Sequence, residues 1–125
     1  MARQSEDNTQ IAIVKYLREV LPADALVAHV PNGGKRSIAQ AARFKAMGVV
    51  AGIPDLIVLV PVGRAIFFEV KRPAGVNQRK GSESVSQLAM RFKLNGLGFD
   101  CATVYGIDDV RNALRALNVR TREAA

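Results

Sequence analysis

The sequence predicts a single α/β domain in which four helices surround a mixed four-stranded sheet. Four segments repeat apolar residues at helical spacing, and two short apolar runs are typical of single strands. Two further apolar runs joined by a turn predict a central hairpin. The 125 residues, 49% of them hydrophobic, are enough for one globular domain spanning 1–125 with a proper core.

The first helix is expected over residues 5–21, with Ser5 or Asp7 as its cap and Pro22 at its end. Glu6 lies on a stripe that continues into core-facing positions, and two interpretations stay open. Its carboxylate could simply favour the helix dipole, or it could reach a metal site.

The next segments are a strand over residues 25–30 and a glycine-rich loop over residues 31–37. The loop fails the test for a nucleotide-binding phosphate loop, because His29 stands where glycine is required and Arg36 where serine or threonine is required. His29 receives no role, whereas Lys35 and Arg36 could contact phosphates of a nucleic acid.

A basic helix follows over residues 37–47, and Gly48 is placed to stop it. The central hairpin then pairs residues 56–60 with residues 65–71 around a turn at 61–64.

Charged residues gather at one end of this hairpin. If the turn is centred near Val62, Asp55 and Glu69 lie nearly opposite each other, on strands ~4.8 Å apart. Glu69 and Lys71 share a face because they are two residues apart. Two close carboxylates repel unless a cation holds them, and oxygen ligands suit Mg²⁺. The alternative is a polar residue at a strand start with an ordinary exposed pair on an edge strand.

Beyond Arg72, a polar loop over residues 74–82 carries Arg79 and Lys80. It is either a DNA-gripping flap that orders on binding or an ordinary solvated loop. Ser84 and Gln87 then have the spacing of a capping box. The helix that they open is expected to bury an apolar stripe of Val85, Leu88, Ala89 and Phe92.

The last elements are a strand over residues 99–105 and a helix over residues 107–117, capped by Asp108. Residues 119–125 are expected to fray. Cys101 lies in an apolar run, so a buried thiol is expected rather than a nucleophile.

The hairpin residues resemble the signature of the PD-(D/E)XK nucleases: a proline–aspartate pair, then Glu69-Val70-Lys71. The rest of the chain narrows the resemblance to the VRR-NUC branch, over nearly the whole length. The matching residues are Glu6, Gln10, Asn32-Gly33-Gly34, Gly48, Gly52-Ile53-Pro54-Asp55, Glu69-Val70-Lys71, Ser84 and Gln87.

The resemblance implies a PD-(D/E)XK nuclease-like core and a DNA endonuclease dependent on Mg²⁺ or Mn²⁺. Asp55 and Glu69 would be metal ligands with the Val70 carbonyl, Lys71 would position water or stabilise charge, and Glu6 and Gln87 would complete the pocket. Standalone members of this length resemble phage or bacterial homodimers that act on branched DNA such as Holliday junctions. The alternative function is a non-catalytic DNA-binding module on the same fold.

Composition supports a polyanionic partner, since the net charge is +7. From this charge and the resemblance, we expect five basic residues to contact DNA: Lys35, Arg36, Arg72, Arg79 and Lys80. No apolar run approaches ~18 residues, so no membrane contact is expected. No signal peptide is evident and one cysteine fits a reducing compartment, so we expect the cytoplasm of a bacterium or of a phage-infected host.

Overall fold

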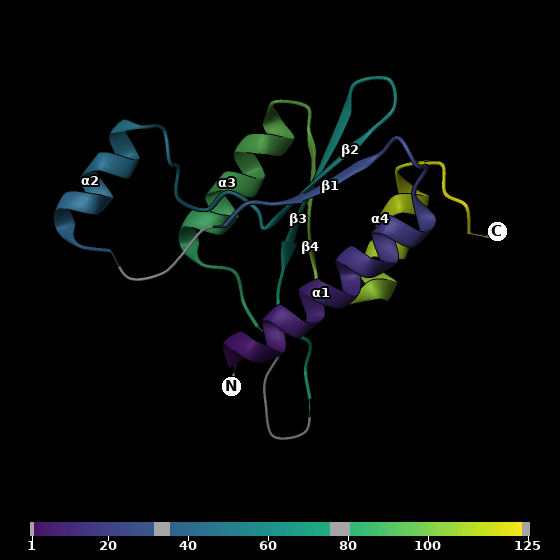
Figure 1. The fold of residues 1–125 in the computed structure, drawn as a ribbon, viewed down its shortest axis with the longest axis horizontal. Helices are drawn as coiled ribbons and strands as arrows, with labels where there is room; N and C mark the ends of the chain where they lie inside the picture. The colour runs from purple at the N-terminus through teal and green to yellow at the C-terminus, as the bar shows by residue number, and fades with distance from the viewer. Residues whose placement is uncertain (1, 32–35, 76–80, 124–125) are drawn as a thin grey trace.

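The structure is a computed structural model of the chain, and it describes residues 2–31, 36–75 and 81–123. It alternates helices and strands along the chain (Figure 1). The elements in order are α1 (Ala2–Val20), β1 (Leu26–His29), α2 (Ile38–Ala46), β2 (Leu56–Val60), β3 (Arg64–Val70), α3 (Val85–Gly96), β4 (Asp100–Val104) and α4 (Ile107–Ala116).

The four strands form one mixed sheet in the order β1-β2-β3-β4, as predicted. The first three strands are antiparallel neighbours, while β4 runs parallel to β3. A parallel neighbour needs a crossover connection, and α3 supplies it between β3 and β4.

Helices cover the two faces of the sheet unequally (Figure 1). On one face α1 and α4 pack side by side over the inward residues of β3, namely Ile66, Phe68 and Val70, which are fully buried. On the other face lies α3, whose contacts are mainly with β4. The apolar core therefore belongs to the α1–α4 side, and polar side chains can occupy the α3 side.

Two predicted helix caps are wrong. Since α1 begins at Ala2, Ser5 and Asp7 lie inside it and cannot cap it. In α4 the N-cap is Gly106, without a side-chain cap, and Asp108 lies in the first turn. The neighbouring Asp109 instead accepts a hydrogen bond from the Tyr105 backbone N–H (2.8 Å).

The segment after α4 is held against the domain, contrary to the fraying expected for residues 119–125. The Arg122 backbone N–H donates to the Val20 carbonyl at the end of α1 (2.6 Å). Glu123 accepts hydrogen bonds from Tyr16 (2.9 Å) and Arg111 (3.1 Å). Residues 124 and 125 lie outside the described residues.

The expected buried stripe of α3 is exposed. Val85, Leu88, Ala89 and Phe92 all face solvent, and Leu94 is the one buried residue of this helix. The helix turns Gln87 toward the sheet instead, because the sheet presents a charged side chain at that point rather than an apolar surface.

The helix α2 stands apart from the sheet and buries none of its residues (Figure 1). Its sequence still encodes its ends: Ser37 and Gln40 form a complete capping box, and Gly48 follows with a positive φ of 103°. Isolated helices shorter than roughly 12–15 residues are marginal in water, so a nine-residue helix of this kind needs another surface.

Gly52 fixes how closely the chain leading into β2 approaches α3. It has a φ of 83°, and a Cβ at this position would overlap the Ser86 carbonyl oxygen and lie 2.7 Å from its carbon. Gly48 has a comparable φ of 103° but open space around it. Comparing the two glycines therefore separates a backbone cost from a steric clash.

We predict that Gly48→Ala lowers the free energy of unfolding by about 1–3 kcal/mol, the usual cost of a strained backbone. Gly52→Ala should cost clearly more, because the N-terminus of α3 must also move. Urea denaturation of both variants measures the difference. Equal losses would contradict the close approach at Gly52.

Candidate active site

The register of the hairpin places the two predicted acidic residues together. Leu56 pairs with Phe68, so Asp55, one residue before β2, lies opposite Glu69, one residue further along β3. The sequence prediction of this pairing is confirmed. Both residues lie at the end of the hairpin away from its turn.

Backbone hydrogen bonds orient Asp55. Its Oδ2 accepts from the Val70 N–H (2.8 Å), and its carbonyl oxygen accepts from the Val30 N–H (2.8 Å). The first bond ties the carboxylate to β3 and the second ties the main chain to β1, which leaves Asp55 little freedom to turn away from Glu69.

Glu69 is the buried acid of the site, with only 3% of its surface exposed. Its Oε1 accepts a hydrogen bond from Gln87 Nε2 (3.0 Å) and lies 3.9 Å from Lys71 Nζ. Its Oε2 is buried and has no hydrogen-bond partner of good geometry within the described part of the chain. A buried carboxylate oxygen left without a partner is costly.

The surroundings of Glu69 raise its pKa from 4.5 to about 9. Burial is the main cause, and the adjacent Asp55 carboxyl adds to it, while the Lys71 ammonium opposes it. Glu69 therefore carries a proton near neutral pH unless a further positive charge enters the site.

Gln87 fulfils two roles that the sequence offered as alternatives. Its Oε1 accepts from the Ser84 backbone N–H (2.9 Å), which completes the capping box of α3. Its Nε2 points the other way and donates to Glu69. A primary amide has separate donor and acceptor ends, so one side chain both starts the helix and holds the acid.

Glu6 belongs to the same electrostatic cluster. It lies beyond the first turn of α1, so the helix-dipole interpretation loses its basis. Its pKa is raised mainly by partial burial, with Lys71 opposing the rise and Asp55 adding to it. We call Glu6, Asp55, Glu69 and Lys71 the carboxylate cluster.

His29 and Gln10 support the site, although the sequence analysis assigned a role to neither. His29 Nδ1 lies 2.9 Å from the Asp55 carbonyl oxygen and 3.0 Å from Gln10 Nε2. This chain of contacts links α1, which carries Glu6, to the residue before β2. One sequence feature could have indicated this contact: Gln10 lies one helical turn after Glu6, on the same stripe of the helix.

A second supporting network, formed by Glu83, Thr103 and Arg91, lies near Lys71. Glu83 accepts a hydrogen bond from Thr103 Oγ1 (2.5 Å) and forms an ion pair with Arg91 (3.2 Å). It ties the start of α3 to β4, so Gln87 is carried on a helix that is fixed at its N-terminus. No pattern in the sequence links these three residues.

The predicted DNA-contacting residues divide into two groups. Arg36 is exposed and lies over the Phe44 ring (4.6 Å), and Arg72 directly follows Lys71 with its Nε buried and without a partner among the described atoms. Lys35, Arg79 and Lys80 lie outside the described residues.

The donor set fits a hard divalent cation better than zinc. Within residues 2–31, 36–75 and 81–123, no group of three or more histidine, cysteine, aspartate or glutamate side chains is arranged to hold a metal ion. Mg²⁺, however, is commonly bound by one or two carboxylates with water and substrate phosphate. Asp55 and the unpartnered Oε2 of Glu69 meet that lower requirement.

Cys101 is half-buried, less than the buried thiol that the sequence predicted. Burial nevertheless raises the pKa of its thiol to about 11, so it is not a thiolate at neutral pH. This agrees with the expectation that it is not a nucleophile.

A mixed four-stranded sheet with helices on both faces and a carboxylate pair at the hairpin end defines an α/β domain. The particular fold is that of a VRR_NUC domain: the chain superimposes on a solved structure described as "VRR_NUC domain protein" with a TM-score of 0.67. The match covers 90% of this chain and 86% of the other, at 24% sequence identity. This superposition confirms the predicted fold. No family model matches the sequence, and neither does any curated protein.

The pKa of Glu69 predicts how stability depends on pH in metal-free protein. The folded chain holds this proton up to about pH 9, whereas the unfolded chain releases it near 4.5, so the free energy of unfolding should fall as the pH rises between these values. Glu69→Gln should flatten this fall.

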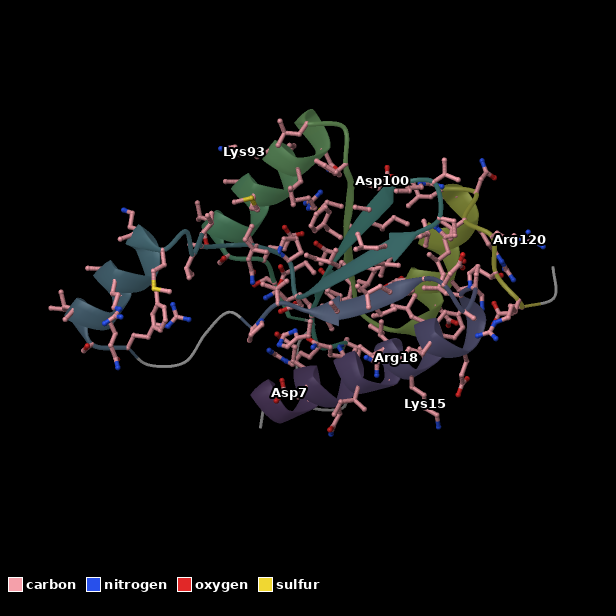
Figure 2. All side chains as sticks on the ribbon, turned by 45° about the horizontal axis from the view of Figure 1, so that its top comes forward. Asp7, Lys15, Arg18, Lys93, Asp100 and Arg120 are labelled. Carbon is pink, nitrogen blue, oxygen red and sulfur yellow. The ribbon has the colours of Figure 1, made fainter. Side chains whose placement is uncertain are left out.

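Denaturant titrations in chelator at pH 5, 7 and 9 provide the measurement. Asp7→Asn, which removes an exposed carboxyl from α1 (Figure 2), is the matched control and should keep the wild-type slope. Equal slopes for Glu69→Gln and wild type would show that Glu69 ionises normally.

Proposed function

We propose that this protein is a divalent-metal-dependent DNA endonuclease that hydrolyses phosphodiester bonds. The observation that carries the proposal is the buried Glu69 carboxyl, held by Gln87 next to Asp55 and Lys71 with one oxygen unpartnered. A protein that needed only stability would gain from an apolar residue at this position. The fold of a VRR_NUC domain agrees with the proposal.

Asp55, Glu69 and the Val70 carbonyl would hold Mg²⁺ or Mn²⁺, with Glu6 as a further oxygen donor. Such an ion, when bound, supplies Lewis-acid polarisation of a phosphoryl oxygen and favours ionisation of water. Binding would displace the proton from Glu69, because an added positive charge offsets the repulsion by Asp55.

Lys71 would act on the reacting phosphate or on the attacking water. Its ammonium lies 3.9 Å from Glu69 and is itself largely buried, so it is fixed in direction. A fixed positive charge in a poorly hydrated site stabilises negative charge that develops in the transition state. Gln87 would keep Glu69 in place during this step.

DNA is the substrate that the charge favours. The net charge of +7 attracts a polyanion, and Arg72 follows directly on Lys71. Its side chain is half-buried beside the carboxylate cluster, and we propose that its guanidinium contacts a phosphate next to the scissile one. Arg36 lies on the α2 side of the molecule and would contact a more distant part of the DNA. Lys35, Arg79 and Lys80, outside the described residues, stay proposed DNA contacts.

We predict that Lys71→Ala binds DNA but cleaves it at least about 10²–10³-fold more slowly, the usual loss for a charge that acts in the transition state. Asp55→Asn should also lose cleavage, and it should lose the increase in melting temperature that Mg²⁺ gives to the wild type. Cleavage of supercoiled, linear and four-way-junction DNA is measured with Mg²⁺, Mn²⁺ or chelator.

Lys15→Ala, which removes an exposed charge from α1, is the control and should keep cleavage within a fewfold of wild type. Wild-type cleavage by Lys71→Ala would refute the assignment. Tight DNA binding without cleavage by the wild-type protein in any metal would favour the alternative, a non-catalytic DNA-binding module.

We further propose that the enzyme acts as a homodimer on branched DNA such as Holliday junctions. The supporting observation is the apolar surface left open on α2 and α3. Ile38 of α2, Met47 at its C-cap, and Val85 and Phe92 of α3 are each at least 67% exposed. None of the residues of α2 is buried. Figure 1 shows both helices on the same side of the molecule.

A second copy fits this surface because a two-fold interface is self-complementary: α2 of each copy would cover α3 of its partner. The arrangement would bury the exposed apolar side chains of α2 and α3 at the same time. It would also supply two carboxylate clusters for the two strands of a symmetric junction. Exposed apolar patches are typical of interaction sites.

We predict a dimer for the wild type in sedimentation velocity and at least about tenfold weaker association for Phe92→Glu. Ile11→Glu is the matched control, because Ile11 is equally exposed (66% against 67%) but lies on α1. It should remain dimeric. A monomeric wild type, with and without junction DNA, would contradict the homodimer.

A further inference from the structure

A second recess lies at the opposite end of the hairpin from the carboxylate cluster. It is a cavity of about 580 Å³, and three separate segments line it: the α1–β1 loop, the β2–β3 turn and the chain that follows α4. Its floor includes apolar side chains such as Val60 and Val119. None of the residues assigned to the proposed active site takes part in it.

The charge of this cavity is positive. Arg64, Arg120 and Arg122 line it against a single acid, Asp24. Arg120 is exposed and makes no hydrogen bond or ion pair within the described residues, and Figure 2 shows it at the end of the molecule away from Asp7. Its guanidinium is free to bind an anion.

The other two arginines are only lightly held. Arg64 reaches Asp100 at 3.5 Å, a long and half-exposed ion pair. Arg122 donates to the Arg18 carbonyl (3.1 Å), which leaves its remaining N–H groups available. Exposed pairs of this kind contribute little to stability, so an anion can compete for these side chains.

Two non-glycine residues with positive φ line the cavity, and local structure accounts for both. Asn118 (φ 55°) ends α4, where the N–H groups of Asn118 and Val119 donate to the carbonyls of Arg115 and Leu114. Val62 (φ 68°) forms the tight β2–β3 turn together with Gly63. The case for a ligand therefore rests on the arginines.

The cavity is much larger than a single phosphate requires, and apolar side chains lie between its arginines. A sugar–phosphate backbone combines these features, because its phosphates are anionic and its deoxyriboses are largely apolar. Arg64 and Glu69 lie at opposite ends of β3, five residue steps apart, and an odd number of steps places their side chains on opposite faces of the sheet. The cavity is therefore a separate surface from the carboxylate cluster.

We propose that this cavity is a second DNA-binding site, which holds a stretch of phosphate backbone away from the carboxylate cluster. The proposal rests on the proposed function for its ligand, but it concerns binding and not catalysis. Arg120 would make the principal phosphate contact.

The experiment measures binding of the full chain to a fluorescent 20-base-pair duplex in chelator, at several salt concentrations. Arg120→Ala should lower the slope of log K against log salt by about 0.9, which is about an eightfold loss of affinity at 100 mM salt. Lys15→Ala removes an equally exposed charge from α1 and is the control. Its slope should equal that of the wild type.

Amide chemical shifts during the same titration locate the contact. Val62, Gly63 and Arg120 should shift along with Asp55 and Glu69. An unchanged slope for Arg120→Ala, or shifts confined to Asp55 and Glu69, would overturn the second site while leaving the proposed nuclease intact. A lowered slope in a protein that cleaves no DNA would support the second site and remove the catalytic proposal.

Discussion

The pairing of β2 with β3 is the constraint on which the rest of the structure depends. It sets Asp55 opposite Glu69 where the hairpin ends, and the Val70 N–H then fixes the Asp55 carboxylate at 2.8 Å. A slip of one residue would turn Glu69 into the apolar core beneath α1 and α4. Because Ile66, Phe68 and Val70 fill that core completely, the register cannot slip without losing it.

The helices act on this pair from both sides of the sheet. From α3, Gln87 holds Glu69, and from α1, Glu6 adds a third acid to the cluster. The cost of collecting acids around a buried carboxyl appears as the raised pKa of Glu69, about 9. This is the electrostatic condition under which a divalent cation binds favourably, and it gives the VRR_NUC fold of this chain its proposed chemistry.

Two surfaces outside this cluster carry features that folding alone does not explain. Apolar residues of α2 and α3 face solvent, although a nine-residue helix gains little stability by itself. At the far end of the hairpin, three arginines and a single acid surround one cavity. Both surfaces suit binding to larger partners, a second copy of the chain at one and a DNA duplex at the other.

Among the described residues, every helix is too short or too polar to span a membrane.

The sequence by itself determined the elements, the hairpin register and the pairing of Asp55 with Glu69, because alternation and turn residues are local signals. It also predicted the capping box at Ser84, and the structure adds an equivalent one at Ser37. Only the tertiary structure decided which helix faces are covered. Apolar periodicity shows that a stripe exists but not that the chain has a surface for it, so the α3 stripe was wrongly expected to be buried. The roles of His29 and Glu83, and the anchoring of the chain after α4, depend on contacts between residues distant in sequence. Such contacts form only when the layers pack.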